Sequence, residues 1–427
     1  MPSQEILAGA IFAGVYLLIV SERLHRTLAA LLGAVVVIAL GLLTQHEAFS
    51  QEIIDFNVIF LLAGMMVIAN ILGKTGLFQW VAVEAVRLTK GDPYRVLVTA
   101  SVVTAVVSSV LDNVTTVVLT VPITFFIAKR LRMDPLPILI SQILASNIGG
   151  TATLIGDPPN LIIGSRLGKD FGDFLLNTGP AALASLVVYL LFARWLFRDS
   201  FRVATLSAAD VDALVAEERK VADPRLMRIG LIVLGLTILG FIVARQVGLE
   251  GATVALAGAV LLMIVGGEDV HEVLKTVEWS SLFFFIGLFI VIGAVVKTGL
   301  ISDLATGALS LTGGRTDVAA LLVLWMSGFL SAIVDNIPYT ITMVPLVAEL
   351  GKTVNIEPLI WALALGANLG GNATVIGASA NVVVSSMAEG RGYPITFRGY
   401  LRYGVPATLL TMIVATIDIW LRYLVFS

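Results

Sequence analysis

The stretch from Ala145 to Gly164 reads ASNIGGTATLIGDPPNLIIG and interrupts a long apolar run. It places glycines, two consecutive prolines, two asparagines and an aspartate where a membrane helix would otherwise continue. Backbone N–H and C=O groups freed by such an interruption are costly in lipid unless protein or a water-filled cavity receives them. The stretch therefore predicts a broken helix, a feature that membrane transporters place around their binding sites.

Composition assigns the chain to the bilayer. Of its 427 residues, 58% are hydrophobic and 13% are charged, whereas soluble domains have about 45–50% and about 25%. The net charge of −3 gives no reason to expect a nucleic-acid partner, and the absence of cysteine excludes disulfides and thiolate chemistry. Apolar runs long enough for a membrane span lie at 5–20, 27–44, 57–73, 178–197, 227–247, 250–267, 280–297 and 402–424.

The segments that do not fit simple spans occur twice. SSVLDN at 108–113 matches SAIVDN at 331–336, an offset of 331 − 108 = 223. ASNIGGTATLIG at 145–156 matches GANLGGNATVIG at 366–377, an offset of 366 − 145 = 221. Similarity between unrelated apolar helices would not preserve these polar positions, so the chain contains two structural repeats.

The repeats predict an all-α polytopic membrane protein of about ten transmembrane helices. Residues 96–128 and 318–348 are each two apolar legs with a polar tip, and we expect re-entrant hairpins there. Residues 135–168 and 358–388 are expected to be broken helices. Each half then crosses the membrane five times, so the second must be inverted. The predicted domains are a first repeat at 1–198, a cytoplasmic linker at 199–225 and a second repeat at 226–427.

Charge predicts the orientation. Lys and Arg accumulate on cytoplasmic loops. Most of the 27 Lys and Arg fall on one side if the N-terminus is external, beginning with Arg23 and Arg26 in the first loop. We therefore expect a multi-pass protein of the plasma membrane with both termini outside the cell.

Three acids are candidate site residues. Asp112 and Asp335 lie at the hairpin tips, and an ionisable side chain within the membrane is a functional candidate by default. The alternative is a helix N-cap. Asp157 has no counterpart, because Ala378 takes its place in the second repeat. It is a candidate for proton coupling or substrate orientation, the alternative being a cap for the helix beginning at Pro158.

Neutral oxygens and backbone groups at the tips and breaks complete the predicted site. Such oxygens can replace the hydration shell of a hard cation, although small polar residues also form ordinary interhelical hydrogen bonds. No cofactor or metal centre is expected; the coupling ion is H⁺ or Na⁺, and Na⁺ would bind at the same residues. Besides the acids, the predicted substrate- and ion-binding residues are Asn113, Ser146, Asn147, Gly149, Gly150, Thr151, Thr153, Asn160, Asn336, Asn368, Gly370, Gly371, Asn372, Thr374 and Asn381.

LDNVTTVVLTVP at 111–122 and SNIGGTATLIGDPPNLII at 146–163 resemble the ion transporter superfamily. The resemblance is to the branch of arsenite/antimonite permeases, the P protein and NhaD-type sodium/proton antiporters, and it covers nearly the whole chain. It implies a scaffold domain, a transport domain with two hairpins and two broken helices, frequent homodimerisation, and coupling to Na⁺ or H⁺.

Inverted repeats with broken helices suit secondary transport by alternating access, not an enzyme. The central motifs hold acids and neutral oxygens but no Lys or Arg. This composition suits a cation or a neutral polyhydroxyl solute such as arsenous acid. We predict arsenite/antimonite efflux in exchange for protons, with sodium/proton antiport as the alternative.

Other functions stay open at this point. Another anion carrier of the superfamily or an ion channel would use the same broken helices, whereas an intramembrane aspartyl protease would not require their repetition. ATP-driven transport would need a separate ATPase subunit, because the chain has no GxxxxGK[ST] loop. The expected partners are a small inorganic substrate, the lipid bilayer, a second copy of the chain and, for ATP drive, that subunit.

Overall fold

The computed structural model describes residues 2–21, 23–89, 92–131, 133–198, 200 and 222–425. This part of the chain folds into helices, which confirms the predicted all-α polytopic class. The predicted linker at 199–225 lies outside the described residues apart from 200 and 222–225. Within the described ranges, five helical segments are long and apolar enough to cross a bilayer: Phe56–Lys74, Gly179–Leu196, Pro224–Val247, Trp279–Thr298 and Phe397–Leu424.

Both halves use the same order of helices, except that the short helix α10 of the first has no counterpart among the described residues of the second. The first contains α1 (Pro2–Val20), α2 (Arg26–Ala39), α3 (Gln45–Ala48), α4 (Phe56–Lys74), α5 (Leu77–Thr89), α6 (Pro93–Ser108), α7 (Asn113–Leu131), α8 (Leu136–Gly150), α9 (Pro158–Leu167), α10 (Phe171–Asn177) and α11 (Gly179–Leu196). The second contains α13 (Pro224–Val243), α14 (Gly251–Gly266), α15 (Val270–Lys275), α16 (Trp279–Thr298), α17 (Leu300–Thr312), α18 (Thr316–Ser331), α19 (Asn336–Leu350), α20 (Ile356–Gly370), α21 (Ser379–Glu389) and α22 (Phe397–Ile419). Short helical turns at Ala244–Val247, Gly371–Ala373 and Trp420–Leu424 complete it.

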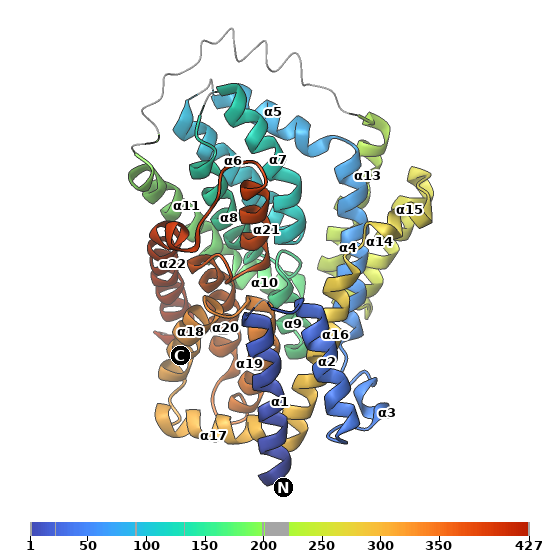
Figure 1. Cartoon of the computed structure of the whole chain (residues 1–427), viewed down its shortest axis with the longest axis vertical. Coiled ribbons are helices and arrows are strands. Elements are labelled where there is room, and N and C mark those ends of the chain that lie inside the picture. The colour runs from blue at the N-terminus through green and yellow to red at the C-terminus, as the bar shows by residue number, and fades with distance from the viewer. Residues whose placement is uncertain are drawn as a thin grey trace.

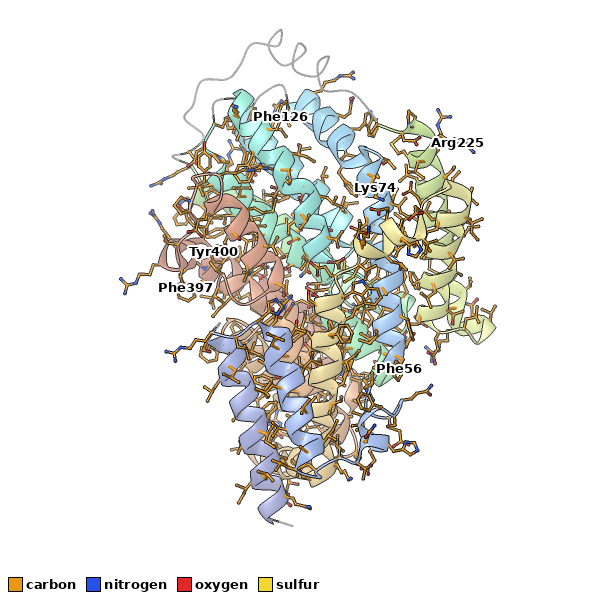
Figure 2. All side chains as sticks on the ribbon, turned by 45° about the vertical axis from the view of Figure 1, so that its right-hand side comes forward. Phe56, Lys74, Phe126, Arg225, Phe397 and Tyr400 are labelled. Atoms are coloured by element: carbon orange, nitrogen blue, oxygen red, sulfur yellow. The ribbon has the colours of Figure 1, made fainter. Side chains whose placement is uncertain are left out.

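The second half runs in the opposite direction to the first. The hairpin of α6 and α7 occupies the upper part of Figure 1, whereas the hairpin of α18 and α19 occupies the lower part. In Figure 2, α4 rises from Phe56 to Lys74. Its counterpart α16 descends from α15 toward α17 at the bottom of Figure 1. The hairpins therefore enter the molecule from opposite ends, as inverted repeats require.

The helices form two bundles. In the scaffold bundle, α4 packs on α13 and α14, and α2 packs on α1 and α16. The hairpin bundle contains α6–α9, α11 and α18–α22, in which α6 packs on α8 and α18 packs on α20. Helices α5 and α17, which the pattern of apolar runs does not predict, connect the bundles and lie across the two ends of the molecule (Figure 1).

Two glycines, one in each repeat, allow scaffold helices of the two repeats to pack closely. A Cβ atom added at Gly64 would lie 2.8 Å from the backbone of Ala255, and one added at Gly287 would lie 2.7 Å from the backbone of Ala30. Glycine permits this close approach of helix backbones, which is a common basis of packing within membranes. The two contacts are related by the repeat, with Gly64 and Gly287 separated by 287 − 64 = 223 residues.

Candidate functional site

The polar residues of the two helix breaks first satisfy the broken backbone. Asn160 Nδ2, on α9, donates to the carbonyl oxygens of Gly150 at 3.1 Å and Thr153 at 2.7 Å. These carbonyls belong to the break between α8 and α9, where helical partners are missing. The second repeat reproduces the arrangement, with Asn381 Nδ2 donating at 2.8 Å to both Gly371 and Thr374.

Hydrogen bonds also connect each break to the hairpin of the same repeat. Ser108 Oγ donates to the carbonyl of Ser146 at 2.7 Å, and Thr153 Oγ1 donates to the carbonyl of Ser109 at 2.5 Å. Gly149 permits the contact, because an added Cβ would lie 2.2 Å from the carbonyl oxygen of Ala105. In the second repeat the corresponding bonds run from Ser331 to Ala367 and from Thr374 to Ala332, with Gly370 against Gly328.

The tips of both hairpins meet on one acid. Asp157 is fully buried at the end of the first break. Its Oδ2 accepts from Asn113 Nδ2 of the first hairpin at 3.0 Å, and Asn336 Nδ2 of the second hairpin lies 3.3 Å from both carboxylate oxygens. These donors are neutral amides. A single carboxylate thus receives hydrogen bonds from tips that enter from opposite ends of the molecule.

Asn147 joins the breaks of the two repeats. Its Oδ1 accepts from Asn113 at 3.0 Å, and its Nδ2 donates to Asn372 Oδ1 at 2.8 Å and to Asn381 Oδ1 at 2.9 Å. All four side chains are buried. Because buried amides are costly without partners, this network fixes the two breaks relative to each other.

The network departs from symmetry at Asn368, the counterpart of Asn147. Asn368 Nδ2 donates to Asn160 Oδ1 at 2.7 Å, but among the described residues its buried Oδ1 has no hydrogen-bond partner. Symmetry would pair this oxygen with Asn336, as Asn147 is paired with Asn113. Asn336 donates to Asp157 instead. Asn113, by contrast, donates to both Asn147 and Asp157, so the two repeats differ in the hydrogen bonds of these amides.

The remaining predicted residues make local contacts. Asp112 Oδ1 accepts from the Thr115 backbone N–H at 2.9 Å, and Asp335 Oδ1 accepts from that of Ile337 at 3.0 Å, so both tip acids also cap their helices. The following hydroxyls bond to main-chain carbonyls: Ser146 to Ile143, Thr151 to Asn147, Thr153 to Ser109 and Thr374 to Ala332. The residues brought together as one cluster, called here the amide cluster, are Asn113, Asn147, Asp157, Asn160, Asn336, Asn368, Asn372 and Asn381.

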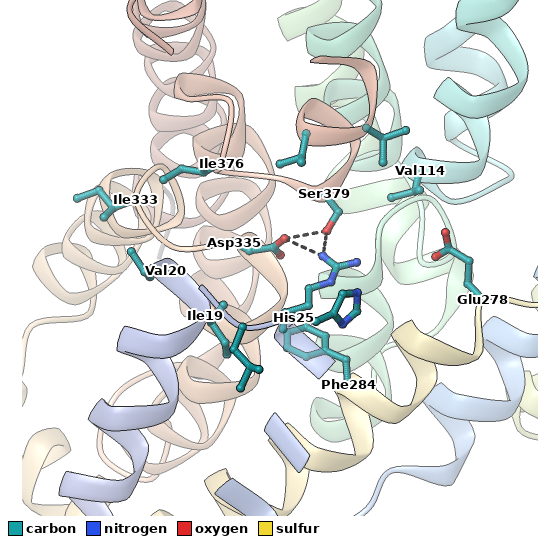
Figure 3. Close-up of a pocket in the computed structure, with 14 residues that line it drawn as sticks. Ile19, Val20, His25, Val114, Glu278, Phe284, Ile333, Asp335, Ile376 and Ser379 are labelled. Carbon is teal, nitrogen blue, oxygen red and sulfur yellow. Dashed lines mark hydrogen bonds and ion pairs between the residues drawn. The ribbon is translucent and has the colours of Figure 1, made fainter. Parts of the chain in front are cut away.

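Two neighbours of the second hairpin tip, Arg26 and Ser379, were not predicted as site residues. Arg26, at the start of α2, donates from Nη1 to Ser379 Oγ at 2.5 Å and lies 3.4 Å from Asp335 Oδ2. Ser379 Oγ in turn donates to Asp335 Oδ2 at 2.7 Å. They border a cavity of about 370 Å³ (Figure 3). The contact spans more than 300 residues of sequence and leaves no local pattern that could have predicted it.

Known proteins resemble the chain over its full length. It is 43% identical to "Uncharacterized transporter Rv2684" of Mycobacterium tuberculosis over 99% of both chains. It is 32% identical to the P protein of Sus scrofa over 96% of this chain and 59% of that protein. A solved structure, that of the YdaH transporter of Alcanivorax borkumensis, shares the fold with a TM-score of 0.61 at 14% identity, covering 96% of this chain and 98% of that one.

A family profile described as "Citrate transporter" (CitMHS) matches residues 16–366. These relatives are transporters and not enzymes, in agreement with the broken helices and the buried amide cluster. The chain is therefore a membrane transporter and belongs to the citrate transporter (CitMHS) family of the ion transporter superfamily.

Proposed function

We propose that this transporter exports arsenite or antimonite across the plasma membrane in exchange for protons, by alternating access. The observation that carries the proposal is the shared acid, Asp157, which accepts hydrogen bonds from Asn113 and Asn336. Whatever occupies or protonates this carboxylate changes the contacts of both hairpin tips. An exchange of occupants would thereby favour one arrangement of the hairpins over another.

The choice of solute rests on which hydrogen-bonding groups are available. Asp157 and the unpaired Oδ1 of Asn368 are acceptors, whereas Asn113 and Asn336 offer N–H donors. Arsenous acid carries hydroxyl groups that both donate and accept, so it can use both kinds of partner. Because the chain has no cysteine, arsenous acid would have to be held by these oxygen and nitrogen groups and not by a thiol.

Citrate fits this cluster less well than the family's description suggests. The three carboxylates of fully ionised citrate are acceptors only, and its one hydroxyl is its single donor, so it can use at most one of the two acceptors at Asp157 and Asn368 and is repelled by the Asp157 carboxylate. The guanidinium of Arg26, which could bind a carboxylate, is already paired with Asp335. We therefore place citrate after arsenite as a substrate.

Sodium/proton antiport is the second candidate function. Hard cations prefer oxygen ligands, and the same two features, the Asp157 carboxylate and the unpaired amide oxygen of Asn368, would serve Na⁺ as well as a hydroxyl. In this alternative, Na⁺ and H⁺ would compete for the cluster, and no arsenic species would move.

One vesicle experiment distinguishes the candidates. The purified chain in proteoliposomes with an imposed pH gradient should move arsenite faster than empty liposomes and consume the gradient in doing so. Proton movement caused by Na⁺ without arsenite flux would instead support the antiporter. Citrate uptake that exceeds arsenite flux would overturn the proposed substrate. Because no other polypeptide is present, gradient-driven arsenite flux would also make an ATPase subunit unnecessary.

A further inference from the structure

Arg26 connects the scaffold bundle to the second hairpin. It begins α2, and its Cζ lies 5.3 Å from the centre of the Phe284 ring on α16, so the guanidinium rests on the scaffold's own surface. From there it reaches Ser379, the first residue of α21, and Asp335, at the tip of the hairpin. One side chain therefore joins a scaffold turn to both a hairpin tip and the half-helix after a break.

The contact is adjacent to the amide cluster. Asp335 precedes Asn336, whose side chain donates to Asp157. A change at Asp157 that displaces Asn336 would move Asp335 with it, because the two are consecutive residues of one tight turn. The ion pair is thus placed where movement of the tip would stretch or break it.

A second carboxylate lines the same cavity as the ion pair. Glu278, immediately before α16, lines the same cavity as Arg26 and Asp335, and Figure 3 shows it across the cavity from Asp335. Its carboxylate accepts a hydrogen bond from Ser281 of its own helix at 3.0 Å. The side chains of Arg26 and Asp335 are 32% and 13% exposed, so water reaches the ion pair.

The first repeat has no matching arrangement among the described residues. The turn between α13 and α14 carries Arg245, whose Nη1 lies 3.4 Å from both Asp170 and Asp173 beside α10. The first hairpin's acid, Asp112, accepts from the backbone of Thr115. The tie between a scaffold guanidinium and a hairpin tip is therefore a specific feature of the second hairpin and not a consequence of repeat symmetry.

We propose that Arg26 is a latch that holds the second hairpin in this conformation and transfers from Asp335 to Glu278 when the hairpin bundle moves. This inference rests on the proposed alternating-access function. It assigns Arg26 a positioning role, because its contacts are with the hairpin tip and with the half-helix α21 and not with the amide cluster itself.

The absence of cysteine allows a direct test by cross-linking. Val20, at the end of α1, and Ile333, at the hairpin tip, lie on the same side of the cavity and are 40% and 43% exposed (Figure 3). A Val20→Cys/Ile333→Cys protein in detergent should be cross-linked by a short bifunctional thiol reagent. Adding Arg26→Gln should reduce the cross-linking rate about five-fold or more, the lower end of typical coupling between sites.

Three further variants separate the latch from general disruption. Arg26→Lys keeps the charge and should retain most of the rate. Tyr16→Phe removes a scaffold hydroxyl that hydrogen-bonds to Pro338 and Thr342 of the same hairpin, and should change the rate much less than Arg26→Gln. A Lys74→Cys/Glu268→Cys pair, which lies within the scaffold, should cross-link equally with and without the Arg26→Gln substitution.

Equal cross-linking of Val20→Cys/Ile333→Cys with and without the Arg26→Gln substitution would overturn the latch, as would a Tyr16→Phe effect of the same size. Either result would leave the transport proposal standing, because that depends on solute flux. Conversely, a protein that cross-links as expected but moves no solute would contradict the proposed function and retain the latch as a structural contact.

Discussion

Asn336, at the tip of the second hairpin, donates a hydrogen bond to Asp157 in the helix break of the first repeat, with 3.3 Å between its Nδ2 and each carboxylate oxygen. The bond crosses from one inverted repeat to the other at a position where only one repeat carries an acid. Asn336 makes no second bond to the Oδ1 of Asn368, which has no hydrogen-bond partner among the described residues. Sequence asymmetry and structural asymmetry thus coincide at the centre of the molecule.

Replacement of Asp157 by Asn should abolish gradient-driven transport while the protein still folds. An amide can neither carry a charge nor take up a proton, and it places an NH₂ donor where one of the two oxygens faced the amide donors of Asn113 and Asn336. An unpaired buried polar group costs about 1–3 kcal/mol. We expect solute flux in proteoliposomes to fall about ten-fold or more. Asp317→Asn, at an exposed ion pair with Arg315, is the matched control and should transport normally. Full activity of Asp157→Asn would remove this acid from the mechanism.

Substitution of Asp112 by Asn separates two roles of this side chain: capping the start of α7 and carrying a charge. Asn is as good an N-cap as Asp, so Asp112→Asn should keep the bond to the Thr115 N–H and change stability by less than about 0.5 kcal/mol. If the carboxylate serves coupling, transport should nevertheless be lost, and the same applies to Asp335→Asn. Normal gradient-driven flux in both variants would exclude a role of the Asp112 and Asp335 carboxylates in coupling.

The close contacts between hairpins and breaks predict a severe effect of small substitutions. Gly149→Ala and Gly370→Ala would place a Cβ 2.2 Å and 2.4 Å from the carbonyl oxygens of Ala105 and Gly328. Overpacking of this kind costs about 1–3 kcal/mol, and we expect a lower melting temperature in detergent. Gly235→Ala, where an added Cβ meets nothing within 4 Å, should be neutral or slightly stabilising. Equal melting temperatures for all three variants would contradict the packing.

An ion pair between the short helix α3 and the last turn of α16 predicts a pH dependence. A hydrogen bond from Lys297 lowers the pKa of the Glu47 carboxyl from its ordinary 4.5 to about 2. A lowered carboxyl pKa adds stability that is present above the ordinary value and is lost as the pH falls toward the lowered one. The melting-temperature difference between wild type and Lys297→Met should therefore be constant above about pH 5 and shrink as the pH falls toward about 3. A difference independent of pH would exclude this contribution.

Much of the fold follows from polar positions in apolar runs. Serine, asparagine and glycine are unusual within long apolar runs. The motifs that contain them at 108–113 and 145–156 recur at 331–336 and 366–377, and this recurrence predicts both hairpins and both breaks. The predicted hairpin at 96–128 corresponds to α6 and α7, and the predicted break after Gly150 corresponds to the gap before α9. Helices α5 and α17 were missed because they carry polar residues along their length and so do not form continuous apolar spans.

Other parts of the site depend on tertiary choices that no local pattern contains. Asn336 has two candidate acceptors, Asp157 and Asn368, and only the packed structure decides between them. Arg26 belongs to a turn that charge statistics assign to a cytoplasmic loop, but it contacts Asp335 across more than 300 residues of sequence. Contacts of this kind depend on how the two bundles pack against each other and cannot be predicted from local sequence.

The central claim is that one solute site at the amide cluster opens alternately to the two sides of the membrane. Exchange of labelled against unlabelled arsenite in proteoliposomes, with no ion gradient, tests it most directly. We expect saturable flux that accelerates when unlabelled arsenite is present on the opposite side, and loss of that flux in Asp157→Asn. Flux that rises linearly with arsenite concentration and does not depend on unlabelled arsenite on the opposite side would contradict this claim. Equal flux in wild type and Asp157→Asn would also contradict it.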